Sequence, residues 1–236
     1  MHAERKEDGS PVTPVDRAAE EVLRQRIRKL FPDHTIVGEE GGESAGNPRV
    51  RWFLDPIDGT KSYIHGVPLY SVLVAVEVEG RPSVGVIHLP ALGETVSAAS
   101  RLGCRWNGRV AHVSLTRDLA DATVLTTSVR ALEAAGASFS QLASATQTQR
   151  GWGDGYGFAL VATGRADAMI DPFLHSWDIA PVVPILEEAG GLVTDWGGAR
   201  TIFSSNYLAS NGKLHAPLLR LLPREGPRRR LRARAR

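Results

Sequence analysis

The chain has 236 residues, of which 42% are hydrophobic and 23% are charged, so it can form a packed core and is not disordered as a whole. No apolar run approaches the roughly 20 residues that span a bilayer, and the polar N-terminus has no signal-peptide core. Cys104 is the only cysteine, which excludes a disulfide framework and a cysteine-ligated zinc site. These features predict a soluble cytoplasmic protein.

The formal net charge of +2 combines an acidic body with a basic tail. Residues 224–236 hold seven arginines and one glutamate, and the remainder holds 21 basic and 25 acidic residues, a net charge of −4. A body of that sign is not by itself a nucleic-acid-binding surface. We predict that residues 223–236 are a disordered tail without a catalytic role, with binding of RNA or an acidic surface as the alternative.

The first half of the sequence predicts one helix followed by a meander of strands. The helix has Thr13 as its N-cap and a proline at position 14, shows helical spacing of apolar residues from Val15 to Leu30, and ends at Pro32. Short apolar or alternating segments predict strands at 35–37, 52–54, 71–78, 84–88, 94–99, 104–106 and 124–127.

The second half alternates between helices and strands. Helices are predicted at 155–162, from Asp178 to the glycines at 190–191, and at 216–222, with strands at 168–170 and 192–194. This mixture, with an antiparallel meander in the middle, predicts a layered α/β or α+β sandwich.

Residues 55–60, Asp-Pro-Ile-Asp-Gly-Thr, carry the strongest chemical signal. A buried strand delivers Asp55 to its C-terminal edge, and Asp58 points into the same loop. Two close carboxylates repel each other unless a proton or a cation lies between them, and Mg²⁺ prefers such oxygen ligands. Gly59 and Thr60 offer close backbone approach and a hydroxyl for a phosphate. The alternative is an ordinary junction between a strand and a turn.

Three further acids lie at places where caps and turns are common. Glu39 follows a predicted strand and can bridge two metals or belong to a solvated turn. Asp178 and Asp16 each stand in the first turn of a predicted helix, where an acid usually caps or interacts with the helix dipole. The seven histidines lack the spacing of a metal pair and are treated as structural or exposed.

Several enzyme classes are excluded by their missing motifs. The sequence has no G-x-x-x-x-G-K-[ST] of P-loop enzymes and no G-x-S-x-G of serine hydrolases. The three-residue spacing of the two aspartates also differs from the Asp-x-Asp of phosphatases of the haloacid dehalogenase type.

Three short motifs occur in order along the chain: Gly-Glu-Glu at 38–40, residues 52–60, and His-Ser-Trp-Asp-Ile-Ala at 175–180. Together they resemble the three signatures of the inositol monophosphatase superfamily, and residues 188–191 and 194–195 match its usual ending. The resemblance covers about residues 8–222. It implies a five-layered αβαβα sandwich in one domain, residues 1–222, with sub-lobes at about 1–128 and 129–222.

The same resemblance implies a Mg²⁺-dependent phosphomonoesterase with two or three ions, acting on a small phosphorylated metabolite, commonly homodimeric and often lithium-sensitive. The implied metal ligands are Glu39, Asp55 and the Ile57 carbonyl for a first ion, Asp55, Asp58 and Asp178 for a second, and Asp16 near a weaker third. Asp58, Gly59 and Thr60 match the phosphate-binding turn, and Thr60 with Glu39 matches the pair that orients the attacking water. Two ions about 3.5–4 Å apart clamp the attacking and leaving oxygens of an in-line displacement.

Within the superfamily, residues 8–14, 59–69 and 153–158 resemble the histidinol-phosphate phosphatases most. Asp154 matches that branch's carboxylate for the substrate amine, and Asp171 matches an acidic position used for polar groups of the substrate, as does Asp178. An ammonium group pairs naturally with a partly buried carboxylate. The alternative is that Asp154 caps the helix that begins near residue 155.

The sequence therefore predicts hydrolysis of histidinol phosphate, a step of histidine biosynthesis, by metal-activated water. Alternatives are a phosphatase for inositol monophosphate, a sugar bisphosphate or a 3′-phosphonucleotide, and, from another class, a regulatory protein that binds RNA through its tail. Two features depart from the family pattern. Members usually carry a further helix before the position of Met1. In addition, residues 175–178 are closer to the general inositol-phosphatase form than to the histidinol-phosphatase form, and Glu is more usual than Asp at position 171.

Overall fold

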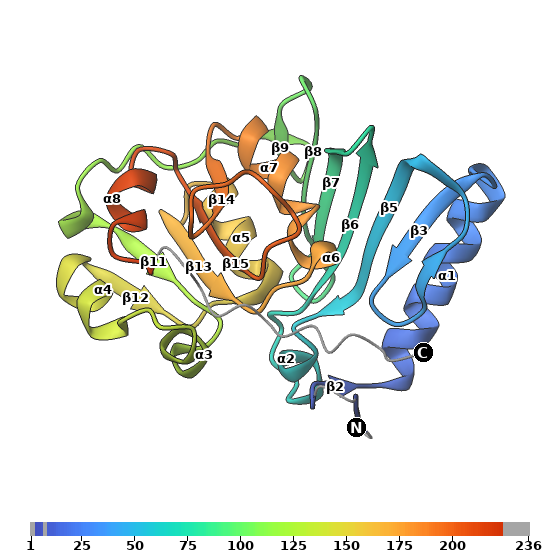
Figure 1. Ribbon diagram of the computed structural model, residues 1–236, viewed down its shortest axis with the longest axis horizontal. Helices are drawn as coiled ribbons and strands as arrows, with labels where there is room; N and C mark the ends of the chain where they lie inside the picture. The colour runs from blue at the N-terminus through green and yellow to red at the C-terminus, as the bar shows by residue number, and fades with distance from the viewer. Residues whose placement is uncertain (1–2, 7–8, 224–236) are drawn as a thin grey trace.

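An eight-stranded sheet and a five-stranded sheet, separated by helices, dominate the computed structural model, which describes residues 3–6 and 9–223 (Figure 1). The strand order is β10-β9-β8-β7-β6-β5-β3-β4 in the first sheet and β12-β11-β13-β15-β14 in the second. A short antiparallel pair, β1 and β2, precedes the first helix. The predicted disordered tail falls, from residue 224 on, outside the described residues.

The strands of the first sheet are β3 (His34–Gly38), β4 (Gly42–Ser44), β5 (Asn47–Asp58), β6 (Ser71–Val78), β7 (Arg81–Leu89), β8 (Glu94–Ala99), β9 (Cys104–Trp106) and β10 (Arg109–Val110). The other strands are β1 (Glu4–Arg5), β2 (Pro11–Val12), β11 (Thr123–Leu125), β12 (Thr148–Arg150), β13 (Ala168–Pro172), β14 (Leu192–Asp195) and β15 (Asn206–Ser210). The helices are α1 (Pro14–Leu30), α2 (Thr60–Ile64), α3 (Val129–Ala134), α4 (Phe139–Ala145), α5 (Asp154–Ala162), α6 (Ser176–Ile179), α7 (Val182–Glu188) and α8 (His215–Leu219), with a 3₁₀ turn at Leu119–Asp121.

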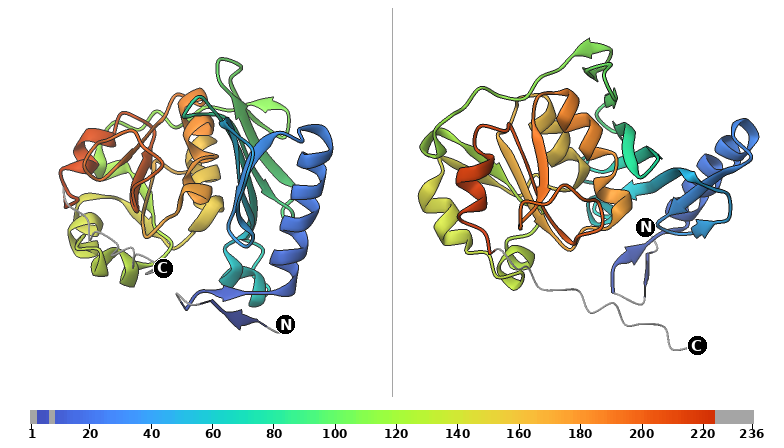
Figure 2. Two further views of the ribbon diagram at one scale, coloured as in Figure 1. Left: turned by 45° about the vertical axis from the view of Figure 1, so that its right-hand side comes forward. Right: turned by 45° about the horizontal axis from the view of Figure 1, so that its top comes forward.

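The helices and sheets stack in five layers. Helix α1 lies on the outer face of the first sheet, α5, α6 and α7 lie between the sheets, and α3, α4 and α8 cover the outer face of the second sheet (Figure 2). The predicted αβαβα sandwich is therefore confirmed. No helix in the described part of the chain is long and apolar enough to cross a membrane.

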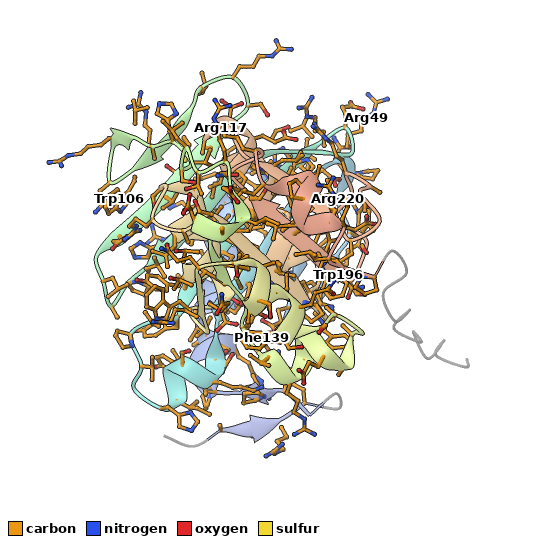
Figure 3. All side chains as sticks on the ribbon, turned by 90° about the vertical axis from the view of Figure 1, so that its left-hand side faces the viewer. Arg49, Trp106, Arg117, Phe139, Trp196 and Arg220 are labelled. Atoms are coloured by element: carbon orange, nitrogen blue, oxygen red, sulfur yellow. The ribbon has the colours of Figure 1, made fainter. Side chains whose placement is uncertain are left out.

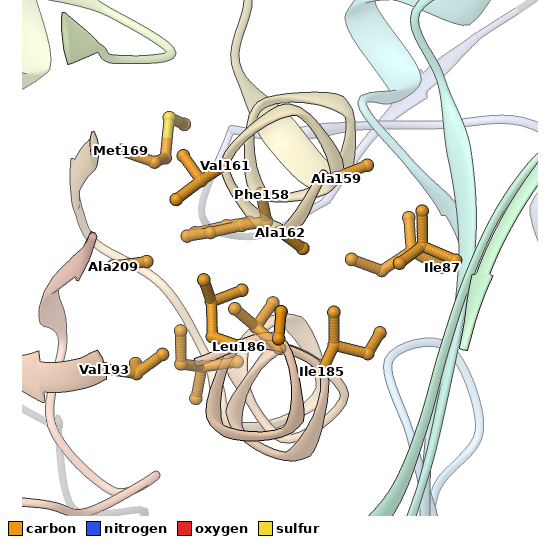
Figure 4. Close-up of a cluster of buried hydrophobic side chains, with 14 of the residues drawn as sticks. Ile87, Phe158, Ala159, Val161, Ala162, Met169, Ile185, Leu186, Val193 and Ala209 are labelled. Carbon is orange, nitrogen blue, oxygen red and sulfur yellow. The ribbon is translucent and has the colours of Figure 1, made fainter. Parts of the chain in front are cut away.

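The largest hydrophobic cluster fills the space between the two sheets. In Figure 4 the side chains of α5 and α7 lie between Ile87 of the first sheet and Met169, Val193 and Ala209 of the second. Seven of the nine residues of α5 are buried because a sheet or helix covers almost every side of it. A smaller cluster, including Trp196, lies under the outer helices that Figure 3 views from outside.

Helix α1 follows the bounds that its sequence predicts. The Thr13 hydroxyl accepts a hydrogen bond from the backbone of Val15, and Asp16 accepts one from the Thr13 backbone at 2.9 Å, which completes a capping box. The helix ends with Phe31 as its C-cap, before Pro32.

The structure corrects one predicted element. The long helix expected from Asp178 to the glycines at 190–191 is two helices, α6 and α7, with Pro181 between them. Proline lacks an N–H and suits a helix start, so it ends one helix and begins the next. The strands at 71–78 and 94–99 have the predicted bounds. The elements that the sequence did not predict are α2, α3, α4, β1, β2, β4, β10, β12 and β15.

The chain passes from the first sheet to the second between Val110 and Thr123. The division into sub-lobes near residue 128 stays a prediction.

Candidate active site

A bulge at the end of β5 brings two carboxylates together. Asp55 pairs with Leu73 and Asp58 with Ser71, so two residues of β5 stand opposite Val72 of β6. In a regular strand, residues three apart point to opposite faces, and the extra residue removes this alternation. Asp55 is 3% exposed, and its Oδ1 accepts a hydrogen bond from the Ile57 N–H at 3.1 Å.

Two further carboxylates come from neighbouring elements. Glu39 directly follows β3, which runs parallel to β5, and its N–H donates to the Leu54 carbonyl at 3.1 Å. Asp178 lies in α6, which packs against β5, and its Oδ2 accepts from the His175 N–H at 2.7 Å in a capping box. The expected cap at Asp178 is thus present, and the same side chain faces the other acids.

Burial and mutual repulsion raise the pKa of these acids. The pKa of Asp55 lies well above its usual range because the group is buried and the charges of Glu39, Asp58 and Asp178 surround it. Burial and the charge of Asp58 likewise raise the pKa of Asp178. The cluster therefore holds an excess of negative charge that a cation would stabilise.

Lys6, which the sequence did not single out, contacts this cluster. Its Nζ lies 2.7 Å from Glu39 Oε1 and 2.5 Å from Glu40 Oε1. Burial lowers the pKa of Lys6, but the hydrogen bonds to Glu39 and Glu40 outweigh it and raise the value. A single lysine in a mixed-charge N-terminus gives no sequence signal for this contact.

The four acids fit a hard metal ion in their chemistry but do not form a ready cage. Among residues 3–6 and 9–223, no three His, Cys, Asp or Glu side chains are arranged so that they could hold a metal ion as they stand. Each acid is instead hydrogen-bonded or paired within the protein, Glu39 to Lys6 and Asp58 Oδ2 to the Ser71 hydroxyl at 2.7 Å. An all-oxygen donor set with unbalanced negative charge suits Mg²⁺, provided that these side chains turn towards it.

Thr60 connects the bulge to helix α1. Its hydroxyl lies 3.0 Å from the Ile57 carbonyl and 3.3 Å from Asp16 Oδ1. A hydroxyl has one proton, so whichever oxygen receives it, the Thr60 oxygen keeps its capacity to accept from another donor. Gly59 precedes Thr60 with φ of +77°, a left-handed conformation that favours glycine.

A cavity of about 300 Å³ opens beside these groups. Its lining includes Glu39, Gly59, Thr60 and Asp154, together with Ser10, Pro11, Lys61, Ser62, Leu69, Thr127, Gly151 and Gly153. The volume lies at the lower end of the range for small-molecule sites. A larger cavity, of about 450 Å³, lies between the β6–β7 turn and residues 200–203 and contains none of the predicted site residues.

Asp154 is held at the start of α5 by a threonine. Its N–H donates to the Thr127 hydroxyl at 2.8 Å, and Thr127 in turn donates to Asp171 Oδ2. The N-cap of α5 is Gly153, which has no side chain. The structure therefore does not support the alternative that Asp154 serves as the N-cap of this helix. Thr127 ends a predicted strand, and a threonine at a strand end carries no functional signal by itself.

Asp171 lies behind Thr127 and does not line the cavity. It is 3% exposed and accepts hydrogen bonds from the Thr126 hydroxyl at 3.3 Å and the Thr127 N–H at 2.9 Å, besides the Thr127 hydroxyl. The structure thus places Asp154 at the cavity, whereas Asp171 is buried and is linked to Asp154 through the Thr127 hydroxyl.

Asp58 links the two groups of acids. The Gly155 N–H donates to its Oδ2 at 2.5 Å, and a Cβ at position 155 would lie 2.7 Å from the same oxygen, so glycine is required for this approach. Burial and the charge of Asp154 raise the pKa of Asp58 to about 8. Burial and the charges of Asp171 and Asp178 raise the pKa of Asp154 to about 7, and burial raises that of Asp171 to about 7.

A profile of the inositol monophosphatase family matches residues 1–226. The chain belongs to this family. A histidinol-phosphatase from Chlorobaculum parvum is 46% identical over 208 residues, which cover 87% of this chain and 80% of the relative. The Nus factor SuhB of Escherichia coli is 34% identical over 230 residues, which cover 93% of this chain and 85% of the relative.

The fold of this family member is also that of solved inositol monophosphatases. An IMPase from Thermotoga maritima has a TM-score of 0.86 and 33% identity, over 94% of this chain and 87% of the other. The predicted family and fold class are confirmed, and this chain is a phosphoric monoester hydrolase.

Without metal, this family member is expected to lose stability as the pH rises from 6.5 to 8.5. The pKa values of Asp154 and Asp171 are about 7 and that of Asp58 about 8, against an ordinary value of 3.8, so the folded state binds these protons more tightly. Their stabilising effect is complete below about pH 4 and is lost as the pH rises through 7 to 8. Below pH 6.5 the opposite effect of His215 enters, because burial lowers its pKa to about 4.

The measurement is the thermal unfolding midpoint across that pH range in excess chelator. Saturating Mg²⁺ should remove most of the fall, because bound ions supply the missing positive charge. A midpoint in chelator that is constant or rises with pH would contradict this account of the buried acids.

Proposed function

We propose that the chain hydrolyses histidinol phosphate to histidinol and phosphate, using Mg²⁺. The observation that carries the proposal is that Asp154 lines the same cavity as Glu39, Gly59 and Thr60. A carboxylate beyond those that would bind metal offers a partner for a cationic group on the substrate. The 46% identity to a histidinol-phosphatase supports the same assignment.

The residues that would hold two ions are Glu39, Asp55 and the Ile57 carbonyl for one, and Asp55, Asp58 and Asp178 for the other, with Asp16 near a weaker third. Bound ions would lower the pKa of the attacking water and stabilise the charge on the phosphate oxygens. The raised pKa values of Asp55, Asp58 and Asp178 support this, because the surplus negative charge favours cation binding.

The protein's own groups would position the water and the phosphate. The Thr60 hydroxyl donates a hydrogen bond to the Ile57 carbonyl or to Asp16, so its oxygen can accept a hydrogen bond from the water and direct a water lone pair towards phosphorus. Glu39 would accept a hydrogen bond from the other O–H of the water once Lys6 no longer occupies its carboxylate. The backbone at Gly59 and Thr60, with Asp58 beside it, would receive the phosphate.

Asp154 would hold the substrate ammonium group, and Asp171, which does not line the cavity, would act on that end of the substrate only through Thr127. The hydrogen bonds from Asp171 through Thr127 to the Asp154 N–H support a role for Asp171 in fixing Asp154. Asp178 would contribute to substrate binding from the metal side.

The deciding experiment compares turnover of four phosphate esters by the Mg²⁺-loaded protein. They are histidinol phosphate, inositol 1-phosphate, fructose 1,6-bisphosphate and a 3′-phosphonucleotide. We expect kcat/KM for histidinol phosphate to exceed the others by at least about tenfold, equivalent to about 1.4 kcal/mol. A higher value for an amine-free ester would overturn the substrate assignment and leave the phosphatase assignment in place.

We also propose a homodimer in the cytoplasm, with a role in histidine biosynthesis and sensitivity to lithium. These follow from the family membership and from the substrate proposed above.

A further inference from the structure

The face that α1 turns towards the sheet carries an ion pair. Glu20 is 2% exposed and Arg24 is 5% exposed, and Arg24 Nε donates to Glu20 Oε1 at 2.7 Å. On the same helix, Val22 and Leu30 are 55% and 71% exposed. Removing two charges from water is costly, and apolar residues at these positions would pack at a lower cost. Packing alone therefore does not explain why Glu20 and Arg24 are buried here.

The remaining hydrogen bonds of this pair go to residues 39–42, the turn between β3 and β4 together with the first residue of β4, which we call loop 39–42. Glu20 Oε2 accepts from the Glu40 N–H at 2.7 Å, and Glu20 Oε1 accepts from the Gly41 N–H at 2.8 Å. Arg24 Nη2 donates to the Gly42 carbonyl at 2.5 Å. Two donors and one acceptor of the loop backbone are thus fixed by two side chains of α1.

The loop also lies directly against the pair. A Cβ at Gly38 would lie 2.2 Å from Glu20 Oε1, and one at Gly41 would lie 2.8 Å from the same oxygen. On its other side the loop is joined to β5, because the Glu39 N–H donates to the Leu54 carbonyl. Glu39 is therefore fixed between the sheet and the ion pair.

We infer that Glu20 and Arg24 are positioning residues that hold loop 39–42 and so set the place of the Glu39 carboxylate. This inference rests on the proposed function, in which Glu39 binds metal and orients water. Neither residue lines the cavity or belongs to the proposed metal ligands, and the pair acts through the peptide groups on either side of Glu40.

Glu20→Gln tests the inference with little change of shape. The amide nitrogen of glutamine is a donor, so it would face the Arg24 guanidinium or a loop N–H where an acceptor is needed. We expect the Mg²⁺ concentration for half-maximal activity to rise at least about tenfold and kcat to fall. At saturating Mg²⁺, KM for the phosphate ester should change less than about twofold, since Glu20 does not reach the substrate.

Glu77→Gln is the matched control. Glu77 is 1% exposed and pairs with Arg51 at 2.7 Å on β6 and β5, away from loop 39–42. Its replacement should lower the unfolding midpoint, as we also expect for Glu20→Gln, without changing the Mg²⁺ requirement. Equal Mg²⁺ dependence in the two variants would overturn the inference.

Gly41→Ala perturbs the contact between the loop and Glu20 from the loop side. Gly41 does not have a left-handed φ, so the added methyl group presses against Glu20 without straining the backbone. It should weaken Mg²⁺ binding, measured by calorimetry in the absence of substrate, in the same direction as Glu20→Gln. Wild-type binding in both variants would overturn the inference.

The same measurements separate this inference from the proposed function. A wild-type protein that binds Mg²⁺ in a Glu20-dependent way but hydrolyses no phosphate ester would refute the function and support the positioning role. A wild-type protein that binds no Mg²⁺ would overturn both.

Discussion

Asp55→Asn is expected to lower kcat/KM by roughly three orders of magnitude or more while leaving the fold intact. Asp55 is the one carboxylate proposed to contact both ions, and burial together with Glu39, Asp58 and Asp178 raises its pKa. Asparagine has the same shape but no charge, so it supplies a weaker ligand. The same change removes one negative charge from a repelling cluster, and the metal-free protein should therefore unfold at the same or a higher temperature.

The measurements are phosphate release at saturating Mg²⁺ and the unfolding midpoint in chelator. Asp121→Asn, at an exposed position outside the site, is the control and should match the wild type in both. Full activity of Asp55→Asn, or of the wild type in excess chelator, would refute the metal-dependent mechanism.

Asp154→Asn is expected to lower kcat/KM for histidinol phosphate by an amount equivalent to about 2–5 kcal/mol of transition-state stabilisation. The loss follows from leaving the substrate ammonium group without a charged partner in a partly buried site. The backbone should be unaffected, because Asp154 has φ of +54°, a conformation that asparagine also tolerates. No helix cap is lost, since the N-cap is Gly153.

The matched substrate is an analogue of histidinol phosphate with hydrogen in place of the amine. Asp154→Asn should change its kcat/KM by less than about threefold, a free-energy difference of about 0.7 kcal/mol. Thr127→Val, which removes the hydroxyl between Asp154 and Asp171, should lower turnover of the amine substrate by a smaller factor than Asp154→Asn. Equal losses on both substrates, or no loss on either, would show that Asp154 does not receive the amine.

The chemistry of the site was readable from the sequence where it depends on adjacent residues. Asp55 and Asp58 stand in one short segment, and a buried strand before them predicts that both reach the same edge. Their actual proximity needs the bulge opposite Val72, which depends on the pairing of β5 with β6. The contact of Lys6 with Glu39 was not predictable, because 33 residues separate them and no periodicity relates them.

The two substrate acids show the same division. The sequence motif marked both Asp154 and Asp171, but their different placements follow from long-range contacts. Asp171 lies in β13, where its carboxylate accepts hydrogen bonds from Thr126 and Thr127, the residues that directly follow β11. Asp154 lies at the cavity because Gly153 and Gly155 allow the chain to pass close to Thr127 and Asp58.

Helix α1 shows most clearly what each level determines. Thr13 with Asp16, and Pro32 at the other end, are local signals, so the sequence by itself determined where the helix begins and ends. Its apolar residues recur at helical spacing, yet Val22 and Leu30 are exposed, while Glu20 and Arg24 are buried on the same face as Ile27. Only the tertiary structure decided this, because loop 39–42 presents N–H and C=O groups that the pair satisfies, and the hydrogen bonds offset the cost of burying its charges.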